Sequence, residues 1–171
     1  MPKLVETPSE YIQRILGNVE GRDPLQVLAA TGARLREIVR DTPPGVLRRR
    51  PAPDMWTAGE IMAHLADAEI VASWRIRSII ARDGVPVQAF DQDDWSRHLR
   101  YDDVDPAESV DLFDATRTAN LRLLRRVDPK RLENHGMHAE RGEETISHLI
   151  RLYAGHDLNH LRQVEELAAR R

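Results

Sequence analysis

Four places along the chain carry the signals that start α-helices, and they constrain the fold more than any other feature of the sequence. In WTAGEI, Thr57 has the side chain of an N-cap and Glu60 follows three residues later, which together form a capping box. In TPSE, DPLQ and DPAE, the N-cap residues Thr7, Asp23 and Asp105 each precede a proline, which fits well at the first helical position. The sequence therefore predicts helices that begin at these four positions.

Apolar residues recur three or four positions apart behind each start, which is the spacing of one helix face. Another stretch with this spacing is predicted to begin near Glu143 and to run almost to the C-terminus. The helix that follows Asp23 must stop at DTPP, because Pro43 and Pro44 cannot continue it. The only strand candidate is VPVQAF, which contains Pro86. The predicted fold is all-α: a four-helix bundle with an additional short N-terminal helix.

The length and the connections of the chain favour one domain. Its 171 residues match the size of an ordinary domain, and no linker or repeat divides them, so residues 1–171 are predicted to form a single helical bundle. A long irregular connection is expected between Gly84 and Asp105. Connections of this length are often functional.

Composition excludes several classes of protein. With 25 basic and 28 acidic residues the net charge is −3, which argues against nucleic acid as a partner. No apolar signal core and no membrane-spanning apolar run are found, so we expect a soluble, cytoplasmic protein without a membrane partner. The absence of cysteine excludes disulfides, thiolate metal sites and a cysteine nucleophile.

Three histidines coincide with the apolar faces of two predicted helices. His156 and His160 are four residues apart in YAGHDLNHLRQVEEL, so their imidazoles lie on the same face of the last helix. His64 lies on or beside the apolar face of the helix that begins at Thr57. If these two helices are neighbours, all three rings point into one bundle interior. The alternative is that each is a hydrogen-bonded core residue without a ligand.

Three imidazoles from two helices suit a divalent transition metal (zinc, nickel, iron or manganese, with zinc or nickel preferred). Three protein ligands leave a position open for water or substrate, which is typical of catalytic sites, whereas structural zinc sites are usually closed. Polar residues near the histidines are predicted to orient the rings; these are Asp67, Asp157, Asn159 and Gln163.

Other histidine patterns are weaker. HDLNH is similar to the zincin motif His-Glu-x-x-His, but Asp157 is one methylene shorter than the glutamate and few residues follow His160, so a protease is disfavoured. His135 and His138 of HGMH are predicted to lie on a loop surface, with the alternative that a mobile loop brings one of them near the site. Neither His98 nor His148 is a preferred ligand, because His98 lies in the long connection and His148 lies to one side of the face that carries His156.

The combination of WTAGEIMAHLADAE with HDLNHLRQVEEL resembles the DinB-like superfamily, which includes YfiT-like proteins and bacillithiol S-transferases. The resemblance covers roughly residues 56–167 and implies a four-helix bundle with a three-histidine metal site at His64, His156 and His160. VPVQAFDQDDW also resembles the family's Asp-x-x-x-Trp segment, which places Asp91 and Trp95 at substrate-binding positions.

The resemblance implies a function less firmly than a fold. Several relatives are transferases or isomerases that use low-molecular-weight thiols such as bacillithiol, mycothiol or glutathione, and a homodimer is the family expectation. The leading hypothesis is therefore a metal-dependent thiol S-transferase acting on a small-molecule electrophile. One alternative is a metal-dependent hydrolase that uses a metal-bound water, with Asp67 or Asp157 as base. The other is a non-catalytic, stress-related metal-binding protein. The catalytic residues, the metal and the substrate are left open by the sequence.

Overall fold

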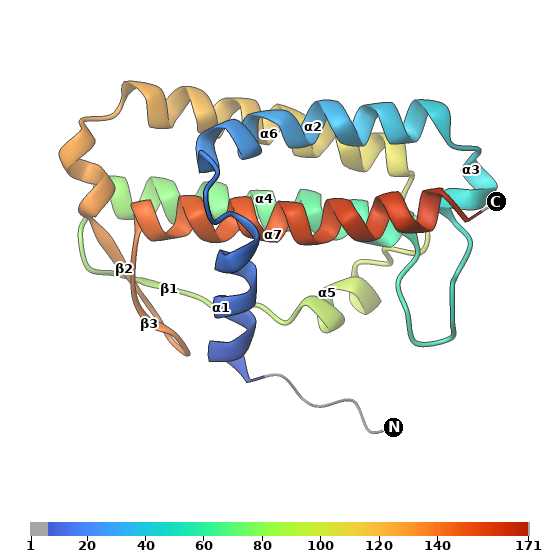
Figure 1. The fold of residues 1–171 in the computed structure, drawn as a ribbon. Coiled ribbons are helices and arrows are strands. Elements are labelled where there is room, and N and C mark those ends of the chain that lie inside the picture. The colour runs from blue at the N-terminus through green and yellow to red at the C-terminus, as the bar shows by residue number, and fades with distance from the viewer. Residues whose placement is uncertain (1–6, 171) are drawn as a thin grey trace.

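Four long helices, aligned side by side, dominate the computed structural model, which describes residues 7–170 (Figure 1). They are α2 (Pro24–Asp41), α4 (Ala58–Ala81), α6 (Pro106–Arg126) and α7 (Ile146–Ala168). The shorter elements are α1 (Pro8–Asn18), α3 (Pro44–Leu47), β1 (Val85–Val87), α5 (Gln92–His98), the 3₁₀ helix η1 (Pro129–Glu133), β2 (His135–His138) and β3 (Gly142–Thr145). The predicted all-α class and four-helix bundle are confirmed.

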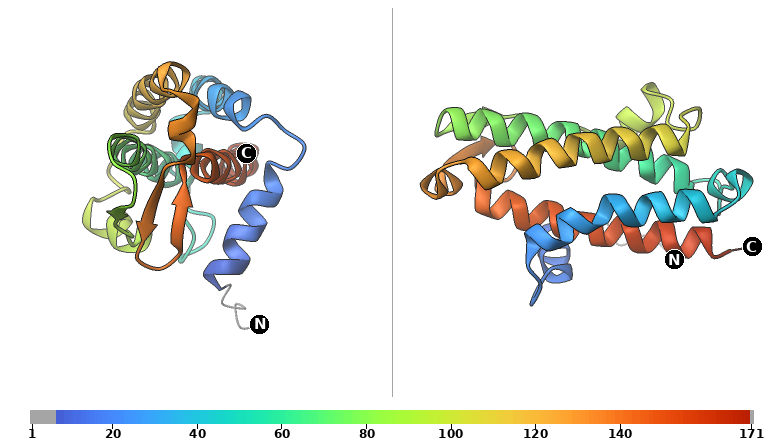
Figure 2. Two further views of the ribbon diagram at one scale, coloured as in Figure 1. Left: turned by 90° about the vertical axis from the view of Figure 1, so that its left-hand side faces the viewer. Right: turned by 90° about the horizontal axis from the view of Figure 1, so that it is seen from above.

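Seen from its end, the bundle places one long helix at each corner (Figure 2). Helix α4 contacts α6 and α7, and helix α2 contacts the same two helices. The colour course in Figure 1 shows that α4 runs antiparallel to α7. The first half of α4 therefore lies beside the middle and second half of α7, and these stretches carry the three histidines.

The helix starts follow the N-cap chemistry of the sequence. Thr7 and Thr57 each accept a hydrogen bond from the backbone N–H three residues later, while the glutamate there accepts one from the cap residue's N–H. Asp23 and Asp105 also cap their helices, by accepting from the backbone N–H two residues on. Local chemistry thus decides where the helices that carry the core begin.

A small three-stranded sheet was largely missed by the sequence patterns. Strand β1 pairs parallel with β2, and β2 pairs antiparallel with β3. Two predictions were therefore wrong: α7 begins at Ile146, because Glu143 belongs to β3, and HGMH is strand β2 rather than a surface loop. His138 is only 3% exposed. The connection between Gly84 and Asp105 contains β1 and α5, so it is less irregular than expected.

Helix α1 crosses α7 at unusually close range. A Cβ atom on Gly155 would lie 2.0 Å from the backbone carbonyl oxygen of Ile15, so only glycine permits this approach. Asn18 also donates a side-chain hydrogen bond to the carbonyl of Gly155. In Figures 1 and 2, α1, α5 and the sheet all lie on the side of the bundle formed by α4 and α7.

The bundle interior is divided into two apolar regions. One surrounds Leu35, Met62 and Phe113, and the other surrounds Ile79 and Leu149. In each long helix, the residues of these two regions are separated by one stretch of chain. Buried polar residues of α4, α6 and α7, including Glu69, Arg117 and Asp157, occupy those stretches. A polar layer therefore separates the two apolar regions.

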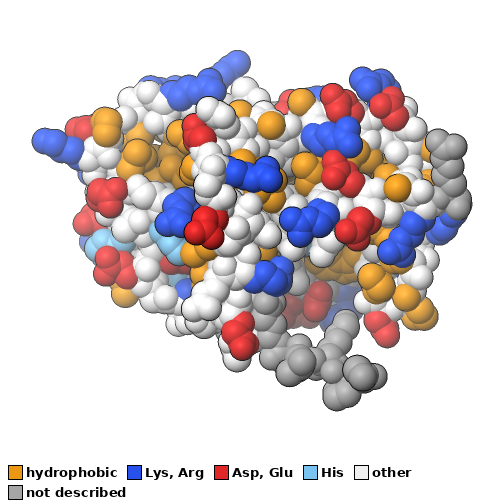
Figure 3. Space-filling view, in the orientation of Figure 1, with side chains coloured by type: hydrophobic (Ala, Val, Ile, Leu, Met, Phe, Trp, Pro, Cys, Tyr) orange, Lys and Arg blue, Asp and Glu red, His pale blue; other side chains and the backbone are white. Residues whose placement is uncertain are grey.

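The surface shown in Figure 3 carries acidic and basic side chains interspersed, with apolar side chains between them. This mixture agrees with the small net charge of −3. Among the described residues, no helix combines the length and hydropathy needed to span a bilayer.

Candidate metal centre

His64 of α4 and the pair His156 and His160 of α7 meet inside the bundle. His64 is 1% exposed and His160 is 8% exposed, while His156 is partly buried beside a pocket. One ligand-type nitrogen from each ring lies within 4.8 Å of the corresponding nitrogens of the other two. The Nε2 atoms of His64 and His156 are 3.1 Å apart. The structure thus brings together the three histidines that the sequence selected.

The orientation of His160 is set by Gln163, one helical turn later. Nδ1 of His160 lies 2.9 Å from Oε1 of Gln163. An amide oxygen only accepts hydrogen bonds, so the proton of a neutral His160 ring resides on Nδ1 and the lone pair on Nε2. Gln163 is therefore placed to orient this ring.

Burial keeps all three rings neutral. Burial first, and then the neighbouring His160, lower the pKa of His64 to about 3. The pKa of His156 is held well below its usual value by burial first, and then by His160 and His64. Burial also lowers the pKa of His160, against the opposing effect of Gln163. Neutral imidazole is the form that binds metals.

The donor set fits a divalent transition metal. Two nitrogens bound to one tetrahedral ion at about 2.0–2.1 Å are roughly 3.3 Å apart, which is close to the 3.1 Å between His64 and His156. With Nε2 bound, each ring carries its proton on Nδ1. The Nδ1 atoms of His64 and His156 have no hydrogen-bond partner among the described residues. No described protein group therefore stabilises the other tautomer, which carries its proton on Nε2. Trp56 packs on His64 with ring centroids 5.1 Å apart.

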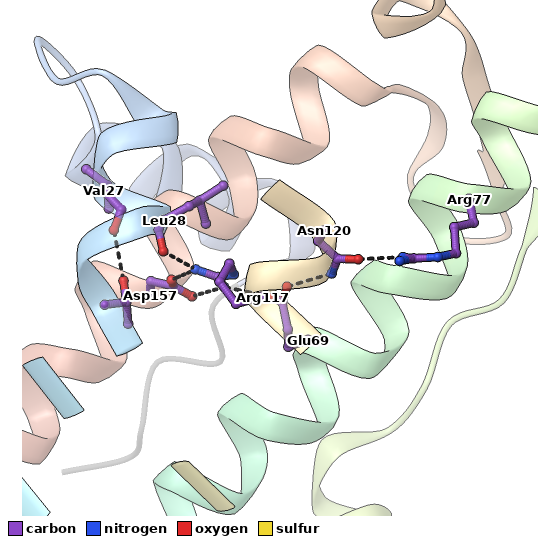
Figure 4. A network of polar contacts seen from close by, with 8 residues as sticks. Val27, Leu28, Glu69, Arg77, Arg117, Asn120 and Asp157 are labelled. Atoms are coloured by element: carbon purple, nitrogen blue, oxygen red, sulfur yellow. Dashed lines mark hydrogen bonds and ion pairs between the residues drawn. The ribbon is translucent and has the colours of Figure 1, made fainter. Parts of the chain in front are cut away.

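Asp157 takes the place of the glutamate in the zincin-like sequence HDLNH, but its side chain pairs with an arginine. Arg117 donates to both of its carboxylate oxygens, at 2.6 and 3.2 Å, and also to Glu69 at 2.7 Å (Figure 4). Asn120 completes this network by donating to the other oxygen of Glu69. Burial alone would lower the pKa of Arg117, but the two carboxylates raise it above its usual value. Asp157 therefore belongs to the polar layer of the bundle, although its charge still acts on His160.

The other polar candidates are dispersed. Asp67 accepts a 2.6 Å hydrogen bond from the Tyr101 hydroxyl, and burial raises the pKa of its carboxyl group. Asn159 accepts one from Arg14 of α1. Of the four residues predicted to orient the rings, Gln163 is the one whose side chain makes a hydrogen bond to a histidine among the described residues.

A pocket of about 360 Å³ opens beside the histidines, and its wall includes His64 and His156. Segments far apart in sequence enclose it: α1 contributes Tyr11 and Ile12, and the turn between β2 and β3 contributes Glu140 and Arg141. The sequence patterns of single helices did not predict these residues as part of the pocket. They reach it because α1 crosses α7 and because the sheet packs beside the bundle.

The connection around Asp91 also borders this pocket, but through residues other than the predicted Asp91 and Trp95. Phe90 and Gln92 line it. Asp91 is the N-cap of α5 and accepts hydrogen bonds from the backbone N–H groups of Asp93 and Asp94. Trp95 packs against Phe90 with ring centroids 4.8 Å apart. Both predicted substrate-binding residues thus shape the segment that forms the wall.

Two neighbouring, antiparallel helices of the bundle direct three neutral histidines at one point. This arrangement defines a class of metal-binding helical proteins. The comparison with protein families gives this class its name. The chain belongs to the DinB superfamily, whose model matches residues 28–164.

Two relatives and one solved structure extend this assignment. A protein of Oceanobacillus iheyensis named "Putative metal-dependent hydrolase OB0782" is 30% identical over 117 residues, which are 68% of this chain and 67% of the relative. "Putative metal-dependent hydrolase YfiT" of Bacillus subtilis is 24% identical over 163 residues, covering 94% and 92%. The structure of Bacillus subtilis YfiT, described as "a probable metal-dependent hydrolase with an unusual four-helix bundle topology", matches with a TM-score of 0.78 at 20% identity, covering 99% and 92%. This last likeness shows a shared fold.

Proposed function

We propose that this chain is a metal-dependent transferase that acts with a low-molecular-weight thiol such as bacillithiol or mycothiol. His64, His156 and His160 would hold the metal. The proposal rests on one observation: both carboxylates expected to act as the base of a hydrolase have other partners. Asp157 is paired with Arg117, and Asp67 accepts a hydrogen bond from Tyr101. A thiolate is itself the nucleophile and needs no base at the moment of attack.

When bound, a divalent transition metal supplies a positive charge that lowers the pKa of a thiol and stabilises the thiolate. The three histidines would bind as neutral imidazoles, which carry no negative charge, and burial keeps them unprotonated. They therefore leave the site with a net positive charge that favours an anionic sulfur over a neutral ligand. The chain has no cysteine, so the sulfur must come from a cosubstrate.

Apolar side chains surround the entrance to the histidines. Ile12, Phe90 and Leu152 line the pocket from three different segments. Apolar walls exclude water and strengthen the electrostatic interactions inside a site. The same walls offer a surface for an electrophilic second substrate beside the sulfur.

Hydrolysis is the second candidate, and a specific residue favours it. Glu140 is the carboxylate residue among those that line the pocket in the described part of the chain, and both relatives carry the name of a metal-dependent hydrolase. In that case Glu140, from the turn between β2 and β3, would take the place of Asp67 and Asp157 as the base.

Cobalt substitution distinguishes the two chemistries. We expect bacillithiol or mycothiol to produce a sulfur-to-cobalt charge-transfer band in the cobalt-loaded protein, and the band to weaken in His64→Ala. A conjugation assay with common electrophiles, with and without metal, then measures transfer. If thiols leave the spectrum unchanged while an ester and amide panel is hydrolysed and Glu140→Gln abolishes that hydrolysis, the transferase proposal is wrong and the hydrolase is supported.

Three further properties belong to the same proposal. Zinc or nickel is the preferred metal, because imidazole ligands suit both, and elemental analysis of the purified protein tests this. A homodimer is the expected assembly, which sedimentation measures. The cytoplasm is the expected location, where small thiols are kept reduced.

A further inference from the structure

Arg75 is a buried cation on the wall of the pocket and has no acidic partner in the described part of the chain. It is 5% exposed and lies on α4, as does His64. Its Nη1 donates to the Tyr153 hydroxyl at 3.3 Å and its Nη2 to the backbone carbonyl of Gln88, both neutral acceptors. Its Nε has no hydrogen-bond partner among the described residues. A buried charge without a counter-ion is costly, so natural proteins usually pair it.

The other arginines in this region are paired. Arg117 lies between the carboxylates of Glu69 and Asp157. Arg141, which also lines the pocket, makes a two-pronged ion pair with the buried Glu144. Within residues 7–170, Arg75 forms no such ion pair, and this distinguishes it from both neighbours.

His138 adds a second donor beside Arg75. Its Nδ1 accepts the backbone N–H groups of Glu140 and Arg141, at 3.2 and 3.3 Å. The proton of the neutral ring therefore resides on Nε2, which lies 3.5 Å from Nη2 of Arg75. Two N–H groups thus face each other, and neither can accept from the other. A shared acceptor between them would satisfy both.

Tyr153 contributes a third donor and connects this place with the histidines. Its oxygen accepts from Arg75, so its own O–H remains available to donate. Its ring centroid lies 6.5 Å from that of His156. Arg75 follows His64 by eleven residues on α4, or about 16 Å of helix rise, and helical side chains lean back toward the N-terminus. Arg75 and Tyr153 therefore line the same pocket as His64 and His156, with Arg75 displaced from His64 along α4, and His138 lies beside Arg75.

We propose that Arg75, Tyr153 and the Nε2–H of His138 form an anion subsite that binds a carboxylate or phosphate group of an elongated substrate. The guanidinium lines the pocket and holds its donors in one plane, the arrangement that matches two oxygens of such a group. The substrate's reactive end then lies at the three histidines and its charged end at Arg75. Only the identification of the anion as part of a substrate rests on the proposed function, because the anion binding itself requires no reaction.

Calorimetric titration of the purified, metal-containing protein tests the subsite. The probes are succinate, its neutral analogue succinamide, and inorganic phosphate. We expect Arg75→Gln to weaken succinate binding by about 10- to 100-fold, because a charge-assisted hydrogen-bond pair is lost. Arg75→Lys keeps the charge without the planar fork and should lose less. Arg151→Gln removes the same charge from an exposed position on α7 and should leave the affinity unchanged.

Three results would overturn the subsite. Equal affinity for succinate and succinamide would show that charge is not recognised. Equal loss in Arg75→Gln and Arg151→Gln, at equal metal content and equal helix content, would assign the effect to net charge. Succinate or phosphate binding that appears only in Glu140→Gln would show that the chain's own carboxylate occupies the place. Because none of the probes is a thiol, absence of transferase activity leaves this test intact, and a failed titration leaves the metal centre intact.

Discussion

The Nε2 atoms of His64 and His156 lie 3.1 Å apart, although 92 positions of sequence separate the two residues. This distance depends on the antiparallel contact of α4 with α7, which brings both residues to the same level of the bundle. A ligand set divided between two helices makes metal binding sensitive to each helix separately.

Replacing His64 or His156 with alanine should lower metal affinity on the order of 100-fold or more, because loss of a ligand changes the coordination number. His98→Ala is the matched control, since His98 lies on α5 outside the three-histidine group. Metal content after dialysis against a graded chelator measures the effect. Equal metal retention in all three variants would remove the site.

Gln163→Leu should reduce metal affinity by about 10- to 100-fold, because the hydrogen bond that orients His160 is lost while the ligand remains. Asn159→Leu is its control on the same helix, where the side chain accepts from Arg14 instead. If the Asn159 variant loses as much metal as the Gln163 variant, the effect comes from the helix rather than from the ring orientation.

The metal-free protein should lose stability as the pH falls below 6.5. A histidine in the unfolded chain has a pKa of about 6.5, whereas burial lowers that of folded His64 to about 3. Between these values the unfolded chain binds a proton and the folded chain does not, so acid favours unfolding by about 1.4 kcal/mol for each pH unit. The contribution is complete above pH 6.5. Urea unfolding at pH 7, 6 and 5 should therefore give a steeper loss for the wild-type protein than for His64→Phe.

The sequence predicted those parts of the fold that local chemistry decides. The capping boxes at Thr7 and Thr57 and the apolar spacing of the long helices are read within a few residues of chain. The three histidines were found for the same reason, because each lies on the inward face of a helix whose apolar spacing can be read locally.

The sheet and the pocket depend on contacts between distant segments. Strand β2 is four residues long and pairs with β1 across about fifty positions, so HGMH alone carries no strand signal. Arg75 reads as an ordinary helical arginine until the sheet brings His138 beside it. Asp157 follows a histidine directly, yet on a helix the next residue points elsewhere, and there it meets Arg117.

Gly155→Ala should destabilise the fold by about 1–3 kcal/mol, because the new methyl group would lie 2.0 Å from the Ile15 carbonyl oxygen. Gly17→Ala is the control, since a Cβ there meets no atom within 4 Å. The same change should displace α1 and with it Tyr11 and Ile12 of the pocket wall. Thermal unfolding measures the first effect. An equal melting temperature for both variants would mean that α1 does not hold this crossing in solution.

Arg117→Met should be the most destabilising of these substitutions, by about 3–5 kcal/mol, because it leaves the buried carboxylates of Glu69 and Asp157 without their cation. Arg36→Met is the surface counterpart: Arg36 also bridges two carboxylates, but at an exposed site where an ion pair contributes about 1 kcal/mol or less. Burial raises the pKa of Glu69, so its carboxyl group is poised to take up a proton once Arg117 is gone. The double variant Arg117→Met, Glu69→Gln should accordingly recover part of the loss, since one of the two unpaired charges is removed. Urea unfolding of the four proteins at pH 7 decides the matter, and similar costs for the two single arginine variants would contradict the buried network as the source of stability.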